Sequence, residues 1–233
     1  MGRDATVKAI EAALEQDPAI NLHSHPVHIE HGDGVRLHGT VADIRAKRRA
    51  LQQARAAAGT ASVDDELRVE RAEARGEREL RQAVVATLMQ EPAFAESRVV
   101  DGDAVAAADA GDVIAVAADG ARVRLDGHVT SVARRRLAEA LAWWVPGVAD
   151  VVNRLQAAPG EPDGDGELAD AIRLVLEKDP SIPARQLEIT ARAGVIRLAG
   201  AVDSEEQRRL ALLDCWYVPG VEGVEDELAV KTP

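Results

Sequence analysis

Histidines are concentrated in one short stretch of the chain, HSHPVHIEH at residues 23–31, and another histidine follows nearby. Imidazole nitrogens are common metal ligands, and side chains two residues apart on a strand share one face. The pattern therefore indicates a metal site built from His23, His25, His28 and His38. If Gly32-Asp33-Gly34 forms the hairpin loop, His28 and His38 are direct cross-strand neighbours. The alternative is a solvated strand face that binds no metal.

Adjacent basic residues form a second candidate site for binding. The three pairs are Lys47-Arg48, Arg135-Arg136 and Arg208-Arg209. Together they could make a stripe that binds phosphate, either in a lipid headgroup or in another anion. Salt bridges to the many nearby carboxylates are the ordinary alternative. No aromatic residues alternate with these pairs and the formal net charge of the chain is -12, so we expect no nucleic-acid partner.

Aromatic residues occur as two pairs, Trp143-Trp144 and Trp216-Tyr217, each just before a Val-Pro-Gly sequence. Trp144 follows Ala142 by about 200° around a helix of 3.6 residues per turn. At least one ring of each pair should therefore point away from its local core. Exposed aromatic pairs are typical of contact surfaces, so we expect these four residues to form an interface. The contact would lie between two parts of the chain or between chains, with local packing as the alternative.

The elements that position these residues repeat three times along the 233-residue chain. Anchor glycines at Gly39, Gly127 and Gly200 stand in VRLHGTV, VRLDGHV and IRLAGAV. A second glycine follows each anchor after 20 positions, at Gly59, Gly147 and Gly220. The repeat therefore divides nearly the whole chain into three similar units.

Each copy predicts the order helix, strand, strand, helix, strand. The first helix of each copy carries an apolar pair one turn apart and ends before Pro18, Pro92 or Pro180, because the residue before proline disfavours helical geometry. Alternating apolar and polar residues then predict a hairpin. The second helix is expected to end at the second glycine, as a left-handed terminator. A short third strand completes the unit.

The resulting fold class is α+β, with three tandem α-β-β-α-β domains, each a three-stranded sheet covered by two helices on one face. The expected domains are residues 1–70, 77–157 and 165–231. Residues 70–78 and 157–167 have the composition of linkers. The second copy contains an inserted loop near 95–112, which has no counterpart elsewhere and has room for one short extra strand.

This pattern resembles the BON domain, a small bacterial module. The resemblance rests on the Val-x-Leu-x-Gly-x-Val strands, the paired basic residues of the second helix and the Val-Pro-Gly-Val turns at 145–148 and 218–221. The first copy departs from it, since Ala57-Ala58-Gly59-Thr60 replaces that turn. The resemblance implies a binding module associated with osmotic and envelope stress, phospholipid surfaces, secretin pores and, in some members, potassium sensing.

No residues indicate catalysis. Cys215 is the single cysteine, and its equivalents in the repeat, Ala54 and Ala142, indicate a buried slot for a small side chain. Asp163, Asp165 and Glu167 resemble only a fragment of a calcium loop, and Asp101, Asp103, Asp109 and Asp112 are scattered. We therefore expect neither an enzyme nor a cofactor.

The functional expectation is a multivalent binding or scaffold protein, related to stress or the envelope, that acts through protein–protein contacts or self-association. A cytoplasmic sensor of potassium ion or of a small ligand is one alternative, and peripheral binding to a phospholipid membrane surface is another. The start MGRDATVKAIEAAL is charged and lacks the apolar core of a secretory signal, and one cysteine excludes an internal disulfide. These features favour the cytoplasm, with an export signal removed ahead of residue 1 as the alternative.

Overall fold

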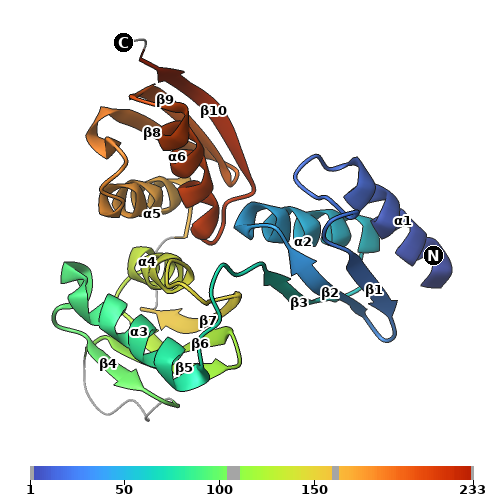
Figure 1. Ribbon diagram of the computed structural model, residues 1–233, viewed down its shortest axis with the longest axis horizontal. Coiled ribbons are helices and arrows are strands. Elements are labelled where there is room, and N and C mark those ends of the chain that lie inside the picture. Colours follow the sequence, from blue (N-terminus) through green and yellow to red (C-terminus); the bar gives the residue numbers. More distant parts are fainter. Residues whose placement is uncertain (1–2, 104–110, 159–162, 232–233) are drawn as a thin grey trace. The chain divides into compact units, whose positions relative to one another are not determined.

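The computed structural model describes residues 3–103, 111–158 and 163–231, and its elements follow one order three times (Figure 1). The part of the 95–112 insertion at 104–110, including Asp109, and residues 159–162 of the expected linker lie outside the described residues. Two compact units are present: Met1–Glu70 contains the first repeat, and Arg71–Pro233 contains the second and third. Among the described residues, no helix is both long and apolar enough to span a membrane.

The first unit is one α-β-β-α-β module. Its central strand, β2, pairs antiparallel with β1 and parallel with β3, and both helices pack on the same core. Alternate strand residues such as Val35 and Leu37 are fully buried beside Ile10 and Leu14 of the first helix. The elements are α1 (Arg3–Gln16), β1 (Val27–His31), β2 (Val35–Val41), α2 (Ile44–Ala58) and β3 (Val63–Val69).

The second repeat adds one strand to this order, so that its sheet has four strands; the sequence predicted a three-stranded sheet with an inserted loop that had room for one short extra strand. The additional strand β4 comes from the described part of the insertion and pairs parallel with β5, so that the strand order is β4-β5-β6-β7. Insertion residues could join the sheet because β5 would otherwise be an edge strand with unpaired backbone groups. The elements are α3 (Glu77–Gln90), β4 (Arg98–Asp101), β5 (Val113–Asp119), β6 (Arg122–Val129), α4 (Val132–Trp143) and β7 (Asp150–Ala157).

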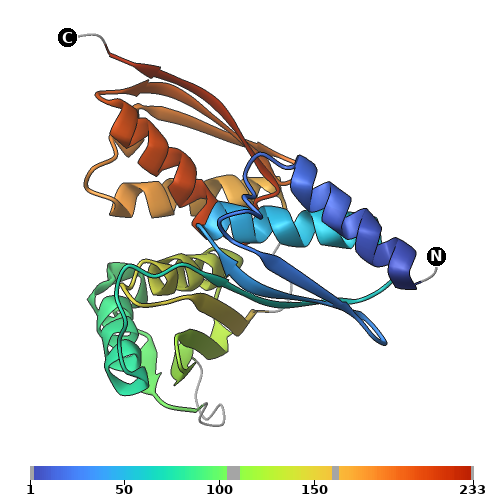
Figure 2. The same cartoon turned by 45° about the vertical axis from the view of Figure 1, so that its right-hand side comes forward.

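The third repeat returns to three strands, in the order β10-β9-β8, with β9 in the centre. Its two helices lie on one face of that sheet, as Figures 1 and 2 both show. Helix α4 of the second repeat contacts α5 and α6 of the third, so these two repeats form a single unit. The elements are α5 (Asp165–Lys178), β8 (Leu187–Arg192), β9 (Val195–Val202), α6 (Glu205–Tyr217) and β10 (Gly223–Val230).

The first helix of every repeat ends two residues before its proline, at Gln16, Gln90 and Lys178, which confirms the predicted stop. The second helix behaves differently from the prediction. It reaches its glycine only in the first repeat, where Gly59 is the C-cap with φ 66°. In the other two repeats it ends earlier, at Trp143 and Tyr217, because proline follows shortly after and bars further helical turns.

The anchor glycines are required by a close approach between strands. Each has a positive φ, of 138° at Gly39, 127° at Gly127 and 126° at Gly200. A Cβ atom there would lie 2.5, 2.1 and 2.5 Å from a carbonyl oxygen at the start of the neighbouring strand or just before it, which is too close for any side chain. The same residue recurs in all three copies because glycine alone fits both the backbone angle and the space.

Candidate functional site

Aromatic rings from the second and third repeats meet at the ends of α4 and α6. The Tyr217 ring lies 6.4 Å from Trp143 and 6.5 Å from Trp144, measured between centroids, and the contact with Trp144 is edge-to-face. Trp144 and Tyr217 are half-buried, whereas Trp143 and Trp216 are buried. The structure thus brings three of the four predicted aromatic residues together within one chain. A role for the same residues between chains stays a prediction.

Arg136 joins the same two repeats through its guanidinium group. Its Nε atom donates a hydrogen bond to the Pro219 carbonyl at 3.0 Å, and an Nη atom contacts the Asp163 carboxylate at 2.6 Å. The side chain is 6% exposed, and burial lowers the pKa of Arg136 while the Asp163 charge opposes that shift. Pro219 belongs to the Val-Pro-Gly-Val turn of the third repeat. The buried Arg136 guanidinium of the second repeat therefore binds this turn.

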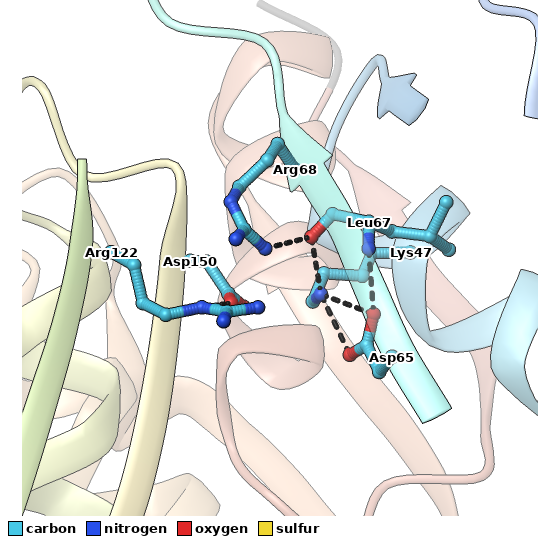
Figure 3. A network of polar contacts seen from close by, with 6 residues as sticks. All are labelled: Lys47, Asp65, Leu67, Arg68, Arg122 and Asp150. Atoms are coloured by element: carbon cyan, nitrogen blue, oxygen red, sulfur yellow. Dashed lines mark hydrogen bonds and ion pairs between the residues drawn. The ribbon is translucent and has the colours of Figure 1, made fainter. Parts of the chain in front are cut away.

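The first member of each basic pair is bonded to the third strand of its own repeat, through its side chain at Lys47 and Arg208 and through its backbone carbonyl at Arg135. Lys47 is buried, with its ammonium 2.7 Å from the Asp65 carboxylate and 2.7 Å from the Leu67 carbonyl oxygen (Figure 3). Asp65 therefore pairs with α2, although its side chain stays 26% exposed. At the equivalent positions Arg208 contacts Asp226 at 2.8 Å, while Asn153 donates to the Arg135 carbonyl oxygen at 2.9 Å.

The third-strand residue at the position of Asp65 also bonds to the backbone of its own strand in every copy. Asp65, Asn153 and Asp226 each accept a hydrogen bond at 3.0 Å from the backbone N–H two residues further on. This local bond is typical of Asp and Asn. Lys47, Arg208 and their partners thus act in a repeated structural contact between the second helix and the third strand.

The remaining basic residues also have acidic neighbours or lie inside the protein. Arg135 contacts Asp163 at 3.0 Å, Arg209 contacts Glu206 at 2.7 Å, and Arg48 is half-buried. A separate ion pair in the second sheet joins Arg122 to Asp150 at 2.7 Å, and Figure 3 draws both residues. These ion pairs favour the structural interpretation of the basic residues, and anion or headgroup binding stays a prediction.

The histidine cluster is partly assembled. His28 and His38 are direct cross-strand partners, as expected for the Gly32-Asp33-Gly34 loop, and their rings stack at 5.0 Å. The His25 side chain instead contacts the Glu70 carboxylate at 3.1 Å. The backbone N–H of His23 donates a hydrogen bond to the Asn21 side chain. Within the described residues, no three or more His, Cys, Asp or Glu side chains are placed to hold a metal ion. Metal binding by these histidines stays a prediction.

The other reactive side chains have structural settings. Cys215 is fully buried, like Ala54 and Ala142, and burial raises the pKa of its thiol above the ordinary range. Asp165 accepts hydrogen bonds from the N–H groups of Ala193 and Gly194 at 2.8 and 3.1 Å, which lower its pKa. The thiol is therefore shielded from solvent, and the Asp165 carboxylate is engaged by two backbone N–H groups.

Sequence reasoning missed two acidic contacts at the junction of the second and third repeats. Glu91 contacts the Lys178 ammonium at 2.8 Å, and the buried Asp214 lies beside the Asp179 carboxyl and the Trp144 indole. A signal was available in the repeat, because Glu91 and Asp179 both occupy the position before the proline that follows the first helix. The repeat therefore marks an acidic position before each proline, but it does not name the partner of that acid in the folded chain.

Repeated α-β-β-α-β modules with a glycine-anchored central strand define a tandem-domain protein. The chain belongs to the BON domain family, whose model matches residues 3–71, 100–159 and 164–232. The match in the second repeat begins at residue 100, after α3 and within β4. The domain limits expected from the sequence stay predictions.

One relative in this family has a similar sequence. Osmotically-inducible protein Y of Escherichia coli (strain K12) is 30% identical over 142 residues, which cover 58% of this chain and 69% of that protein. Two solved structures of CdsD, a structural protein of the type III secretion system of Chlamydia trachomatis, are each 14% identical. The first covers 100% of both chains at a TM-score of 0.27, and the second covers 97% of this chain at 0.26. Scores this low carry no structural argument.

Proposed function

We propose that this chain is a non-enzymatic, multivalent binding protein of the osmotic stress response that acts through protein–protein contacts. The observation that carries the proposal is the presence of three copies of one binding module, two of which are fused into one unit by aromatic and arginine contacts. The printed name of the osmotically-inducible relative supports the link to stress. Several modules on one chain raise the overall affinity for a partner without requiring a strong single contact.

The settings of the reactive side chains support a role without catalysis. The Cys215 thiol is buried and has a raised pKa, and the Asp165 carboxylate is occupied by two backbone N–H groups. Both are used inside the fold. The basic residues are similarly engaged by carboxylates, which disfavours the phospholipid alternative. The cytoplasmic location expected from the sequence stays a prediction.

The test uses the full chain in two measurements. Light scattering over a range of concentrations reports self-association, and cross-linking in cells after an osmotic upshift reports protein partners. A mass well above 24.8 kDa, or a defined cross-linked partner, supports the proposal. A chain that stays monomeric and cross-links to nothing overturns it. Thermal stabilisation that is specific to potassium over sodium would instead favour the cation-sensor alternative.

A further inference from the structure

Asp214 is a buried carboxyl group at the junction between the second and third repeats. It lies on α6 and is 4% exposed, and its Oδ2 atom is buried without a hydrogen-bond partner of normal length among the described residues. Its polar neighbours are the Asp179 carboxyl at the end of α5 and the Trp144 indole at the end of α4. A buried carboxylate beside another carboxylate is unfavourable unless one of them is protonated.

The other repeats show what normally occupies this position. Asp179 corresponds to Asp17 of the first repeat, and Asp214 corresponds to Gln53, which stands equally far from its anchor glycine. The Gln53 amide donates to the Asp17 carboxylate at 2.9 Å, and Arg49 contacts the same oxygen. The first repeat therefore supplies donors to this acidic group, whereas the third repeat supplies a second acid.

Among the described residues, no basic side chain acts on the pKa of Asp214 in the third repeat. The position of Arg49 is occupied there by Leu210, and Lys178, next to Asp179 in the sequence, contacts Glu91 at 2.8 Å. Protonation of Asp214 is the remaining way to remove the repulsion between the two carboxyl groups.

The surroundings of Asp214 all favour its neutral form except one. Burial raises the pKa of Asp214 to about 8, the Asp179 carboxyl adds to the shift, and the hydrogen bond with the Trp144 indole opposes it. Asp179 is the titratable group that faces Asp214 from α5, and the facing group from α4 is the indole, which does not titrate. On α6 itself the neighbour is the Cys215 thiol, whose own pKa is raised by burial and by the charge of Asp214. Among the described residues, no basic side chain of β9 or β10 contributes to this pKa.

We propose that Asp214 keeps its proton at neutral pH beside the Asp179 carboxyl, and that loss of this proton in mildly alkaline solution loosens the packing of α6 against α4. The folded chain holds the proton more tightly than the unfolded chain, in which aspartate has its ordinary pKa of 3.8. The contribution of the Asp214 proton to the free energy of unfolding is therefore fully present below pH 3.8 and is lost as the pH rises through about 8. The junction is a pH-sensitive contact between two modules of one chain.

The chain carries its own probe for this contact. Its three tryptophans, Trp143, Trp144 and Trp216, all lie at the end of α4 or on α6, so tryptophan fluorescence of the full chain reports on the junction. The wild-type emission should change in one step with a midpoint near pH 8 while circular dichroism stays constant. Emission that is constant from about pH 6 to about pH 9.5 would overturn the proposal.

Two variants identify the titrating group. Asp214→Asn introduces an amide, as Gln53 does in the first repeat, and should abolish the step while keeping the wild-type emission of neutral solution. Glu206→Gln, which changes an exposed carboxylate on the same helix, should leave the step in place. A step that persists unchanged in Asp214→Asn counts against the proposal. If that variant does not fold, carboxyl carbon NMR of the wild type decides, because it must show an aspartate that titrates near pH 8.

Discussion

The Trp144 indole and the Tyr217 ring pack edge-to-face, with 6.5 Å between the ring centroids and 86° between the ring planes. Trp144 is the C-cap of α4 in the second repeat, and Tyr217 is the last residue of α6, the equivalent helix of the third repeat. Edge-to-face pairs of this kind contribute about 1 kcal/mol beyond the apolar area that they bury. The pair therefore explains why residues that the sequence marked as an interface lie within one compact unit.

Removing both rings should destabilise the unit formed by the second and third repeats. We expect Trp144→Ala combined with Tyr217→Ala to lower the free energy of unfolding by about 3 kcal/mol, because two half-buried aromatic side chains lose their contacts. Denaturant unfolding followed by circular dichroism measures the change. The control is Met89→Ala, since Met89 is 64% exposed and should change stability by less than about 0.5 kcal/mol. Wild-type stability in the double variant would mean that the rings do not hold the repeats together.

The anchor glycine of the second repeat should not tolerate a methyl group. In Gly127→Ala the new Cβ atom would meet the Val113 carbonyl oxygen at 2.1 Å, at a φ of 127°. Gly102 offers a matched comparison, since its φ is 122° and no atom lies within 4 Å of the Cβ position. We expect Gly102→Ala to cost about 1 to 2 kcal/mol from backbone strain and Gly127→Ala more than about 3 kcal/mol. Equal losses in thermal or denaturant unfolding would remove the steric explanation.

The sequence predicted the helices and the central strands because their signals are local and repeated. The prolines at 18, 92 and 180 stop a helix wherever they stand, and apolar pairs such as Ile10 and Leu14 mark a buried face by spacing alone. His28 and His38 were correctly paired because the loop length fixes the register of a hairpin. These features depend on a few neighbouring residues.

The remaining features depend on contacts between distant residues. Arg136 and Arg209 occupy the same position in the repeat, yet Arg136 is buried against Pro219 while Arg209 is exposed beside Glu206. Their difference comes from the neighbouring repeat, which a local pattern does not contain. Strand β4 was likewise unpredictable as a partner of β5, because pairing depends on the free edge of a sheet that has already formed.

The buried contact between Lys47 and Asp65 should respond unequally to removal of either partner. The Lys47 side chain is 6% exposed and that of Asp65 is 26% exposed, so Asp65→Ala leaves a buried ammonium whereas Lys47→Met leaves a carboxylate that water can reach. We expect a loss of about 3 kcal/mol for Asp65→Ala and a smaller loss for Lys47→Met. Arg209→Met, at the exposed pair with Glu206, should cost less than about 0.5 kcal/mol. Unfolding curves that rank the first two variants in the opposite order would contradict this account.

The Cys215 thiol should be unreactive in the folded protein. It is fully buried, it donates to the Ala211 carbonyl oxygen at 3.3 Å, and burial raises its pKa. A chromogenic disulfide reagent near pH 8 should label the native chain slowly and the denatured chain at once, since labelling needs local opening and a thiolate. As the chain has one cysteine, the colour change reports on this position alone. Rapid stoichiometric labelling of the native protein would show that α6 opens readily.

The first repeat should lose stability in acid, opposite to the alkaline response expected of the third. Hydrogen bonds from Gln53, the Ala19 N–H and Arg49 lower the pKa of Asp17 below 3.8, although burial alone would raise it. The unfolded chain therefore takes up a proton at higher pH than the folded chain. The contribution of Asp17 to the free energy of unfolding is present above the ordinary aspartate pKa and is lost as the pH falls through the lower pKa of the folded state.

Arg49→Leu removes a donor to Asp17 and should reduce this acid dependence. NMR of the first-repeat amides measures the change, because that repeat has no tryptophan. Exposed Arg36→Leu serves as the control. An acid transition that is identical in wild type and Arg49→Leu would show that the bonds to Asp17 do not set it.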